Sequence, residues 1–285
     1  QLEWHWEVPP ELAAQRVQRG ELEATGGDLP AAVVLQLQQS NVGDQLQQWD
    51  SFSLRWHELD VTQPPFDDIR VRQAFNYAYN KERLQRLLIK ADGHFYPPGL
   101  LGYDPELTVY AYDPERARAL LAEAGYETGL TVELPILAED DARAQLLQQD
   151  LAEVGVTVTL KNDPQGVYDY GRAVRDVYRI WARGWGMGLP DPSEIVNSLA
   201  GTDAPSNYGG YGNPRIDELG REGQTVLDPG LRSEIYAEIE RLLVEDAAFL
   251  FEGVALWGTL RRPELQNFVW EPVNYEHWDR YWLQP

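Results

Sequence analysis

The chain has 285 residues, enough for one large domain or two modest domains with a hydrophobic core. Its 24 Lys and Arg against 46 Asp and Glu give a net charge of −22, which argues against a nucleic-acid backbone or an anionic membrane surface as a partner. With 43% hydrophobic residues and no cysteine, the composition is that of a folded acidic protein without disulfides, thiolate nucleophiles or cysteine-ligated metals.

Two stretches near the start of the chain are predicted to be strands. Residues 33–38 and 52–59 are apolar segments of strand length. No apolar run reaches the roughly 18–20 residues that span a bilayer, so we expect a soluble chain. Residues 1–7 lack the basic start and the apolar segment of a secretory leader. We therefore expect that residue 1 either follows a processing site or lies inside a longer protein.

Apolar residues recur at helical spacing after residues 64–68, which can cap a helix. Asn80 begins a second predicted helix, and Asp113-Pro114 begins a third that Gly125 ends. The apolar positions of these helices are Val71, Ala74, Phe75, Ala78, Leu84, Leu87, Leu88, Ala117, Leu120, Leu121 and Ala124.

A strand, a helix and a second strand follow, the strands at residues 130–136 and 156–160. Because the segment between them is long enough for a crossover, the two strands are predicted to be parallel. A short helix near residues 168–174 leads to a third strand at 177–183, which we expect in the same sheet, with helices on both faces. The crossover helix carries Leu146, Leu147, Leu151 and Val154.

The last third of the chain continues the alternation of helices and strands. Asn213-Pro214 and Asp228-Pro229 each pair a capping side chain with a helical proline, and they predict two further helices. Residues 248–257 are predicted to be a buried strand, and the aromatic C-terminus is expected to supply one or two short strands. The fold class is therefore α/β.

The motifs of metal, nucleotide and serine-nucleophile sites are absent from the sequence. The four histidines are scattered, and no Gly-x-Ser-x-Gly or Gly-Lys-Ser/Thr occurs. The pairs Asp67-Asp68 and Asp140-Asp141 precede helices, where carboxylates are better explained as caps than as calcium ligands. Gly184-x-Gly186-x-Gly188 lacks the spacing of a dinucleotide fingerprint. We expect no cofactor, no metal and no catalysis.

Aromatic residues beside glycines are the strongest candidates for a binding site. The chain has 10 Trp and 15 Tyr, and a glycine-rich loop at residues 184–192 follows a predicted strand. In open α/β sheets, ligands bind outside the carboxyl ends of the strands, and pockets there use flat apolar side chains. The candidate ligand-binding residues are Trp185, Gly186, Met187, Gly188, Asp191, Tyr208 and Tyr211.

Two other functions are compatible with these residues. A carbohydrate-active or carbohydrate-binding protein would stack its Trp and Tyr rings on sugar faces beside a pair of carboxylates. A structural or interaction domain would use the same aromatic residues with no small ligand. Hydrolysis of chromogenic glycosides separates the enzyme from a binding protein.

Several stretches, in a fixed order, resemble one known family. They are PFDDIRVRQAFNYA at residues 65–78, YDPERARALLAEAGY at 112–126, GWG at 184–186, PDP at 190–192, YGNPRID at 211–217 and EDA at 245–247. Together they resemble the extracytoplasmic solute-binding proteins of family 5, the oligopeptide, dipeptide and nickel class that serves ABC importers.

The resemblance implies a lobe of the periplasmic-binding-protein type II fold, cluster C type, within a two-lobed clamshell. It implies that residues 1–60 are part of the first lobe, 61–258 the C-terminal α/β lobe and 259–285 a return into the first lobe, so that the chain is a fragment. A peptide-like or other small solute is expected between the lobes, with a membrane permease as partner. The implied location is periplasmic or extracellular, membrane-associated through the permease or a lipid anchor, and the full-length protein is expected to be monomeric.

Position 188 departs from the family pattern. In peptide-binding members an aspartate a few residues after the Gly-Trp turn pairs with the α-ammonium group of the ligand, whereas the third residue after Trp185 is Gly188. A buried ammonium without a counter-charge is costly. Asp191 is expected to cap the next helix instead, and Met187 makes the loop more apolar. The resemblance thus implies a capped, modified or non-peptide ligand.

Overall fold

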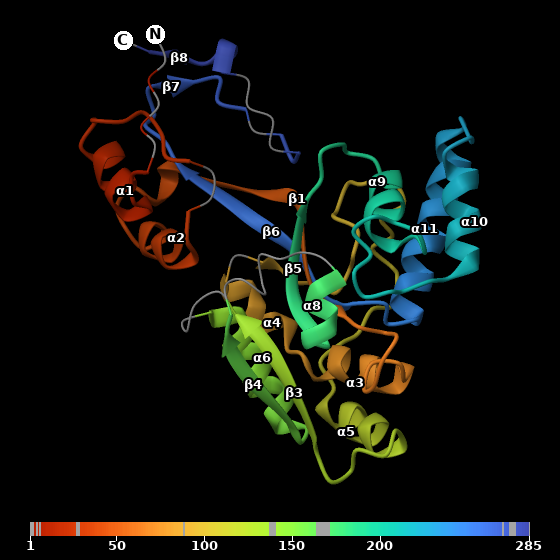
Figure 1. Ribbon diagram of the computed structural model, residues 1–285. Helices are drawn as coiled ribbons and strands as arrows, with labels where there is room; N and C mark the ends of the chain where they lie inside the picture. The colour runs from red at the N-terminus through yellow and green to blue at the C-terminus, as the bar shows by residue number, and fades with distance from the viewer. Residues whose placement is uncertain are drawn as a thin grey trace. The chain divides into compact units, whose positions relative to one another are not determined.

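The computed structural model describes residues 3, 5, 7–26, 29–87, 89–136, 141–163, 172–269, 271–273 and 278–284 (Figure 1). They form two compact units, one made of Gln1–Phe52 with Ala255–Pro285 and the other of Ser53–Val254. We call them unit 1 and unit 2. That they correspond to the two predicted lobes stays a prediction. No helix among the described residues is long and apolar enough to cross a membrane.

Unit 1 contains two helices and short strands. Its helices are α1 (Pro10–Gln18) and α2 (Ala31–Gln38), followed by the 3₁₀ turn η1 (Gly43–Gln45). The predicted C-terminal strands are confirmed as β7 (Leu265–Gln266) and β8 (Trp282–Leu283), which pair antiparallel. The 3₁₀ turn η4 (Trp278–Arg280) precedes β8.

The predicted strand at residues 33–38 is wrong, because this segment lies within the helix α2. The buried side chains of α2 are Val33, Val34 and Leu37, which share one face of a helix, whereas Leu35 is 41% exposed. On a strand, Leu35 would share the face of Val33 and Leu37. A short apolar run is compatible with both the helical and the strand repeat, and the burial pattern of the side chains shows that this segment is helical.

Strands β1 (Leu46–Leu59) and β6 (Leu250–Leu260) each belong partly to unit 1 and partly to unit 2. They are the central strands of a four-stranded sheet with the order β2-β6-β1-β5, where β2 is Ile89–Lys90 and β5 is Ile180–Gly186. The strands predicted at 52–59 and 248–257 are therefore confirmed; β1 begins earlier than predicted, and β6 both begins and ends later.

The helices predicted in the first part of unit 2 are confirmed. They are α3 (Ile69–Ala78), α4 (Lys81–Leu84) continued by the 3₁₀ turn η2 (Gln85–Leu87), and α5 (Pro114–Glu123). Their N-caps are Asp68, Asn80 and Asp113, each of which accepts a hydrogen bond from a backbone N–H of the first turn. Leu88, which was assigned to the second helix, lies outside the described residues.

The strand, helix and strand of the crossover are confirmed as β3 (Leu130–Ile136), α6 (Ala142–Glu153) and β4 (Val156–Asn162). Strands β3 and β4 pair parallel, with Leu130 opposite Val156 (Figure 1). Asp141 caps α6 as expected, whereas Asp140 lies outside the described residues. One core cluster joins these elements to α3 and α5 through buried residues that include Phe75, Leu121, Leu134, Leu147 and Val156.

The third strand does not join this parallel sheet, and that prediction is wrong. Strand β5 pairs antiparallel with β1, with Leu59 opposite Ile180 and Leu54 opposite Trp185. It begins three residues later than predicted because α8 (Arg172–Val177) occupies the start of the predicted strand. The short helix expected near residues 168–174 lies largely outside the described residues. The alternation of apolar residues indicates a strand but does not determine which other strand it pairs with.

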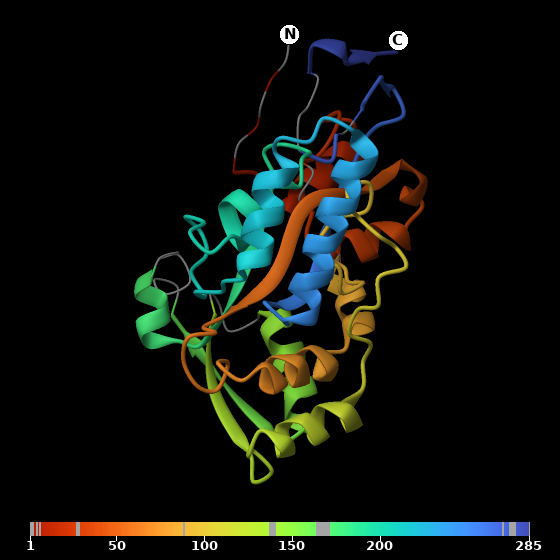
Figure 2. The same ribbon diagram turned by 90° about the vertical axis from the view of Figure 1, so that its right-hand side faces the viewer.

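The helices after the glycine-rich loop are α9 (Ser193–Ile195), the π-helical turn η3 (Val196–Ala200), α10 (Pro214–Gly223) and α11 (Pro229–Glu245). Asn213 and Asp228 cap α10 and α11 as predicted. Helices α10 and α11 pack side by side in unit 2 (Figure 2).

Helix α3 and strand β6 are joined through the buried side chain of Asn76. Its amide donates to Phe249 O at 2.9 Å and accepts from Phe251 N at 3.1 Å. The amide therefore satisfies both kinds of backbone group on the strand.

A second buried polar group in unit 2 surrounds the carboxylate of Glu252. One oxygen lies 3.1 Å from His57 Nδ1 and accepts from Tyr79 at 3.2 Å, and the other accepts from Arg143 at 2.6 Å. Burial raises the pKa of Glu252, but Arg143 and His57 outweigh burial and hold that pKa at about 2.

We predict that Glu252→Gln destabilises unit 2 and weakens the pH dependence of its free energy of unfolding under acidic conditions. Because the pKa of Glu252 in the folded state lies below its ordinary value of 4.5, its stabilising contribution is complete above about pH 4.5 and is lost as the pH falls towards 2. At pH 7 the variant leaves Arg143 without its carboxylate, at a cost of about 3 kcal/mol. Urea unfolding from pH 7 to pH 2.5 measures both effects, with Glu82→Gln on the surface as the control. A parallel pH dependence of the variant and the parent would contradict the prediction.

Candidate functional site

The candidate loop begins at the end of β5, which the β1 pairing holds in place. Trp185 lies opposite Leu54 and Gly186 opposite Ser53, so the first two loop positions are still on the strand. The Trp185 ring is partly exposed, and Gly186 and Gly188 are exposed. The loop thus presents part of an indole and bare backbone at the carboxyl end of a strand.

The carboxylate of Glu194, in the first turn of α9, organises this loop. Glu194 Oε1 accepts from the indole Nε1 of Trp185 at 2.7 Å and from Gly188 N at 3.1 Å. Glu194 Oε2 accepts from Leu189 N at 2.8 Å. Three donors that the loop would otherwise present to solvent are satisfied by one side chain. The indole N–H is therefore directed inward, and the exposed part of the ring is left for apolar contact.

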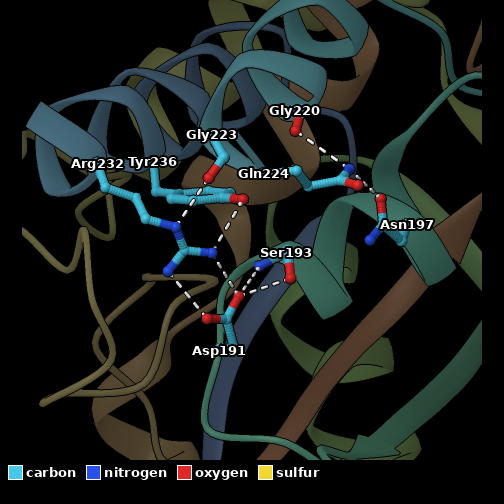
Figure 3. A network of polar contacts seen from close by, with 8 residues as sticks. All are labelled: Asp191, Ser193, Asn197, Gly220, Gly223, Gln224, Arg232 and Tyr236. Atoms are coloured by element: carbon cyan, nitrogen blue, oxygen red, sulfur yellow. Dashed lines mark hydrogen bonds and ion pairs between the residues drawn. The ribbon is translucent and has the colours of Figure 1, made fainter. Parts of the chain in front are cut away.

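Asp191 closes the loop through an ion pair with Arg232, and its part in ligand binding stays a prediction. Its carboxylate accepts from Ser193 N and Oγ at 2.9 and 2.6 Å, at the start of α9, although the N-cap position itself is Pro192. It also receives both terminal nitrogens of Arg232, at 2.9 Å each (Figure 3). The hydrogen bonds from Arg232 and Ser193 hold the pKa of Asp191 at about 2. Arg232 itself lies over the Tyr236 ring and donates to Gly223 O, which fastens the loop to α11.

Met187 and Tyr211 are buried within unit 2. Met187 is 3% exposed and Tyr211 is 5% exposed. The hydroxyl of Tyr211 donates to Asp246 at 2.6 Å, and burial together with this bond raises the pKa of Tyr211. The backbone of Tyr211 is held by the side chain of Asn207. Both residues contribute packing in the structure, and their part in ligand binding stays a prediction.

Tyr208 belongs to a second group, around the buried guanidinium of Arg183. The Arg183 group lies 4.5 Å from the centre of the Tyr208 ring and 5.4 Å from that of Trp56. Beside it, Glu58 accepts from Trp56 Nε1 at 2.9 Å and from Gly209 N at 3.1 Å. Burial raises the pKa of Glu58, against the opposing charge of Arg183 and these hydrogen bonds.

Gly209 is required by close approach rather than by a ligand. A Cβ atom added there would lie 2.3 Å from Leu59 O and 2.9 Å from Glu58 Oε1. At Gly186, in contrast, an added Cβ would meet nothing within 4 Å. The two glycine-rich stretches are therefore different: one serves packing of the backbone against β1, and the other leaves space open.

The structure brings some of the predicted residues together and separates others. Trp185 and Gly188 both bond to Glu194, whereas Tyr208 lies with Arg183 and Tyr211 with Asp246. Sequence reasoning missed the three charged residues that hold these groups, Glu58, Arg183 and Glu194. Only Glu194 had a readable signal, because Asp191 and Glu194 have the spacing of a capping box.

Two hollows on the protein surface are lined by other residues than those of this loop. One, of about 360 Å³, is lined by residues of α2 and η1 in unit 1. The other, of about 250 Å³, lies between α10 and α11 in unit 2. No group of three or more metal-ligating side chains occurs among the residues with described positions.

We predict that Glu194→Ala releases the loop. Loss of the carboxylate leaves the amides of Gly188 and Leu189 without their acceptor, and charge-assisted hydrogen bonds of this kind are worth about 1.5–3 kcal/mol. Hydrogen exchange at these two amides is expected to accelerate about tenfold or more, with Glu106→Ala as an exposed control. Unchanged protection of both amides would show that the carboxylate does not hold the loop.

Comparison with known proteins places these observations in a family. The family profile described as "Bacterial extracellular solute-binding proteins, family 5 Middle" matches residues 8–207. The dipeptide-binding protein of Escherichia coli K12 is 26% identical over 278 residues, covering 93% of this chain and 51% of the relative. The glutathione-binding protein GsiB of Pectobacterium atrosepticum is 30% identical over 234 residues, covering 76% of this chain and 45% of the relative.

Solved structures share the fold. The clavulanic acid biosynthesis oligopeptide-binding protein 2 superposes with a TM-score of 0.85 at 22% identity, covering 98% of this chain and 55% of that chain. The chain spans about half the length of the relatives that it matches. Because the profile matches well over half of the chain, in the region that holds α1 to β5 and the candidate loop, the chain belongs to the family 5 bacterial extracellular solute-binding proteins.

Proposed function

We propose that this chain is part of the substrate-binding component of an ABC importer, which binds a peptide-like or other small solute and delivers it to a membrane permease. The family match over residues 8–207 carries the proposal. The relatives named above are binding proteins for dipeptides and glutathione, and this chain takes a related class of solute.

The candidate loop supports a binding role and suggests how the site works. A partly exposed indole and the bare backbone of Gly186 and Gly188 offer an apolar wall with hydrogen-bonding groups, which suits a small solute. Glu194 and the Asp191–Arg232 pair fix this wall before a ligand arrives, so less ordering entropy is lost on binding. Site residues in this proposal are Trp185, Gly186, Met187, Gly188, Asp191, Tyr208 and Tyr211, supported by Glu194.

The proposal places the protein in the periplasm or outside the cell, beside its permease, with binding as its whole activity. Proteins of this kind work by closing around the solute and presenting the closed form to a partner, so selectivity resides in the pocket and no bond is broken. The carbohydrate alternative has no support from the relatives and structures named above.

Ligand titration tests the proposal directly. Calorimetry measures binding of dipeptides, tripeptides, N-acetylated peptides, glutathione and cellobiose. It is carried out on the 285-residue chain and on the protein encoded by the complete open reading frame. We expect saturable binding of at least one peptide-like solute and no hydrolysis of chromogenic glycosides. Glycoside turnover that disappears when one carboxylate is replaced would overturn the binding-protein assignment, and binding of cellobiose alone would overturn the solute class.

Gly188 sets the preference of the site for the amino end of a peptide. The nearby Glu194 carboxylate already accepts from three donors, so it is poorly placed to take an ammonium group as well. A Cβ at position 188 would meet only Glu194 Oε2, at 4.0 Å, so a larger residue fits there. The natural sequence therefore favours solutes without a free α-ammonium group at this point.

We predict that Gly188→Asp shifts the preference towards free amino ends, while Gly188→Asn, of equal size and no charge, does not. A new carboxylate provides the missing counter-charge, and one charge-assisted hydrogen bond corresponds to roughly a tenfold gain in affinity. The measured quantity is the ratio of Kd values for a free peptide and its N-acetylated form. Equal ratios for the Asp and Asn variants would show that position 188 does not face the amino end.

A further inference from the structure

The hollow between α10 and α11 is a second surface feature of unit 2, separate from the candidate loop. We call it the α10–α11 hollow. It is a surface hollow that is open to solvent, with a volume of about 250 Å³. Its apolar lining comes from Leu219, Val226, Leu231 and Ile235. A hollow of this size takes one or two large apolar side chains.

Exposed leucines lie at the hollow and next to it in the sequence. Leu231 is 56% exposed, and the neighbouring Leu227, in the connection between the two helices, is 94% exposed. Single exposed leucines are common on protein surfaces. Here Leu231 lines the hollow and Leu227 directly follows the lining residue Val226, so the two add exposed apolar surface of the kind found at docking sites.

The charged residues of the hollow carry a surplus of negative charge. The lining contains Arg215 and three glutamates, Glu222, Glu234 and Glu238. Arg215 is already engaged by Glu238 at 3.1 Å and by Glu218 at 2.8 Å. Within the described part of the chain, Glu222 and Glu234 have no ion-pair partner. An occupant with two positive charges beside an apolar group would satisfy both.

We propose that the α10–α11 hollow docks a cationic amphipathic segment of a partner protein, with one or two apolar side chains in the hollow and Lys or Arg side chains towards Glu222 and Glu234. The net charge of −22 selects among occupants. A second copy of this chain would bring like charge to an acidic surface, and an anionic membrane is repelled in the same way. A basic protein segment is attracted to the hollow by charge and held there by apolar contact.

The probe for the test is a 14-residue peptide of Leu and Lys at helical spacing, labelled for fluorescence anisotropy and titrated with the 285-residue chain. An acidic protein binds any cationic peptide weakly, so matched variants carry the test. Glu222→Gln with Glu234→Gln removes two charges at the hollow, and Glu82→Gln with Glu106→Gln removes two elsewhere on the surface. The double variant Leu227→Ser with Leu231→Ser removes two exposed leucines at the hollow. Its control is the double variant Leu12→Ser with Leu35→Ser, which removes two exposed leucines in unit 1.

We expect both hollow pairs to weaken binding at least about fivefold and both control pairs to change it less than twofold. A Leu and Glu peptide of the same pattern is expected not to bind. Equal losses in hollow and control variants would overturn the proposal, since binding would then be general charge attraction. So would self-association of the chain that Leu227→Ser with Leu231→Ser abolishes, or stronger binding to anionic lipid vesicles than to the peptide. Thermal unfolding of each variant confirms that it is folded.

Discussion

The antiparallel pairing of β5 with β1 is the constraint on which the candidate site depends. The register sets Trp185 opposite Leu54 and places Glu58 of β1 beside Arg183 of β5. A slip of one residue would turn every side chain of β5 to the other face, and the indole would no longer meet Glu194. The buried Glu58 and Arg183 make such a slip costly, because two buried polar groups of opposite charge type would be separated.

Local signals predicted most elements of the fold but not how its strands are assembled. Asp113-Pro114 and Gly125 mark both ends of α5, since capping and left-handed backbone depend on a few adjacent residues. The error at residues 33–38 arose because a short apolar run is compatible with both the helical and the strand repeat. The error at β5 arose because its partner, β1, lies more than 100 residues earlier in the chain, and pairing over that distance leaves no local pattern.

The sequence also predicted the position of the candidate loop better than its internal contacts. Glycines and an indole after a strand are visible without a structure. The carboxylate that holds them is one of 46 acidic residues, and its role follows from the path of the loop back towards α9. Tyr208 and Tyr211 are only three residues apart, yet one stacks on Arg183 and the other bonds to Asp246, because the turn between them reverses the chain.

The bond between Asn76 and β6 has a consequence for how the protein is made. Asn76 is separated from Phe249 by 173 residues. At about 5–20 residues per second, a ribosome completes α3 roughly 10 to 35 seconds before the strand that it packs against. During that interval the Asn76 amide lacks the backbone groups of Phe249 and Phe251 that it bonds in the folded chain. The Asn76 bonds can therefore form only after translation has passed residue 251, whereas most residues that share the core cluster with α3 are synthesised earlier.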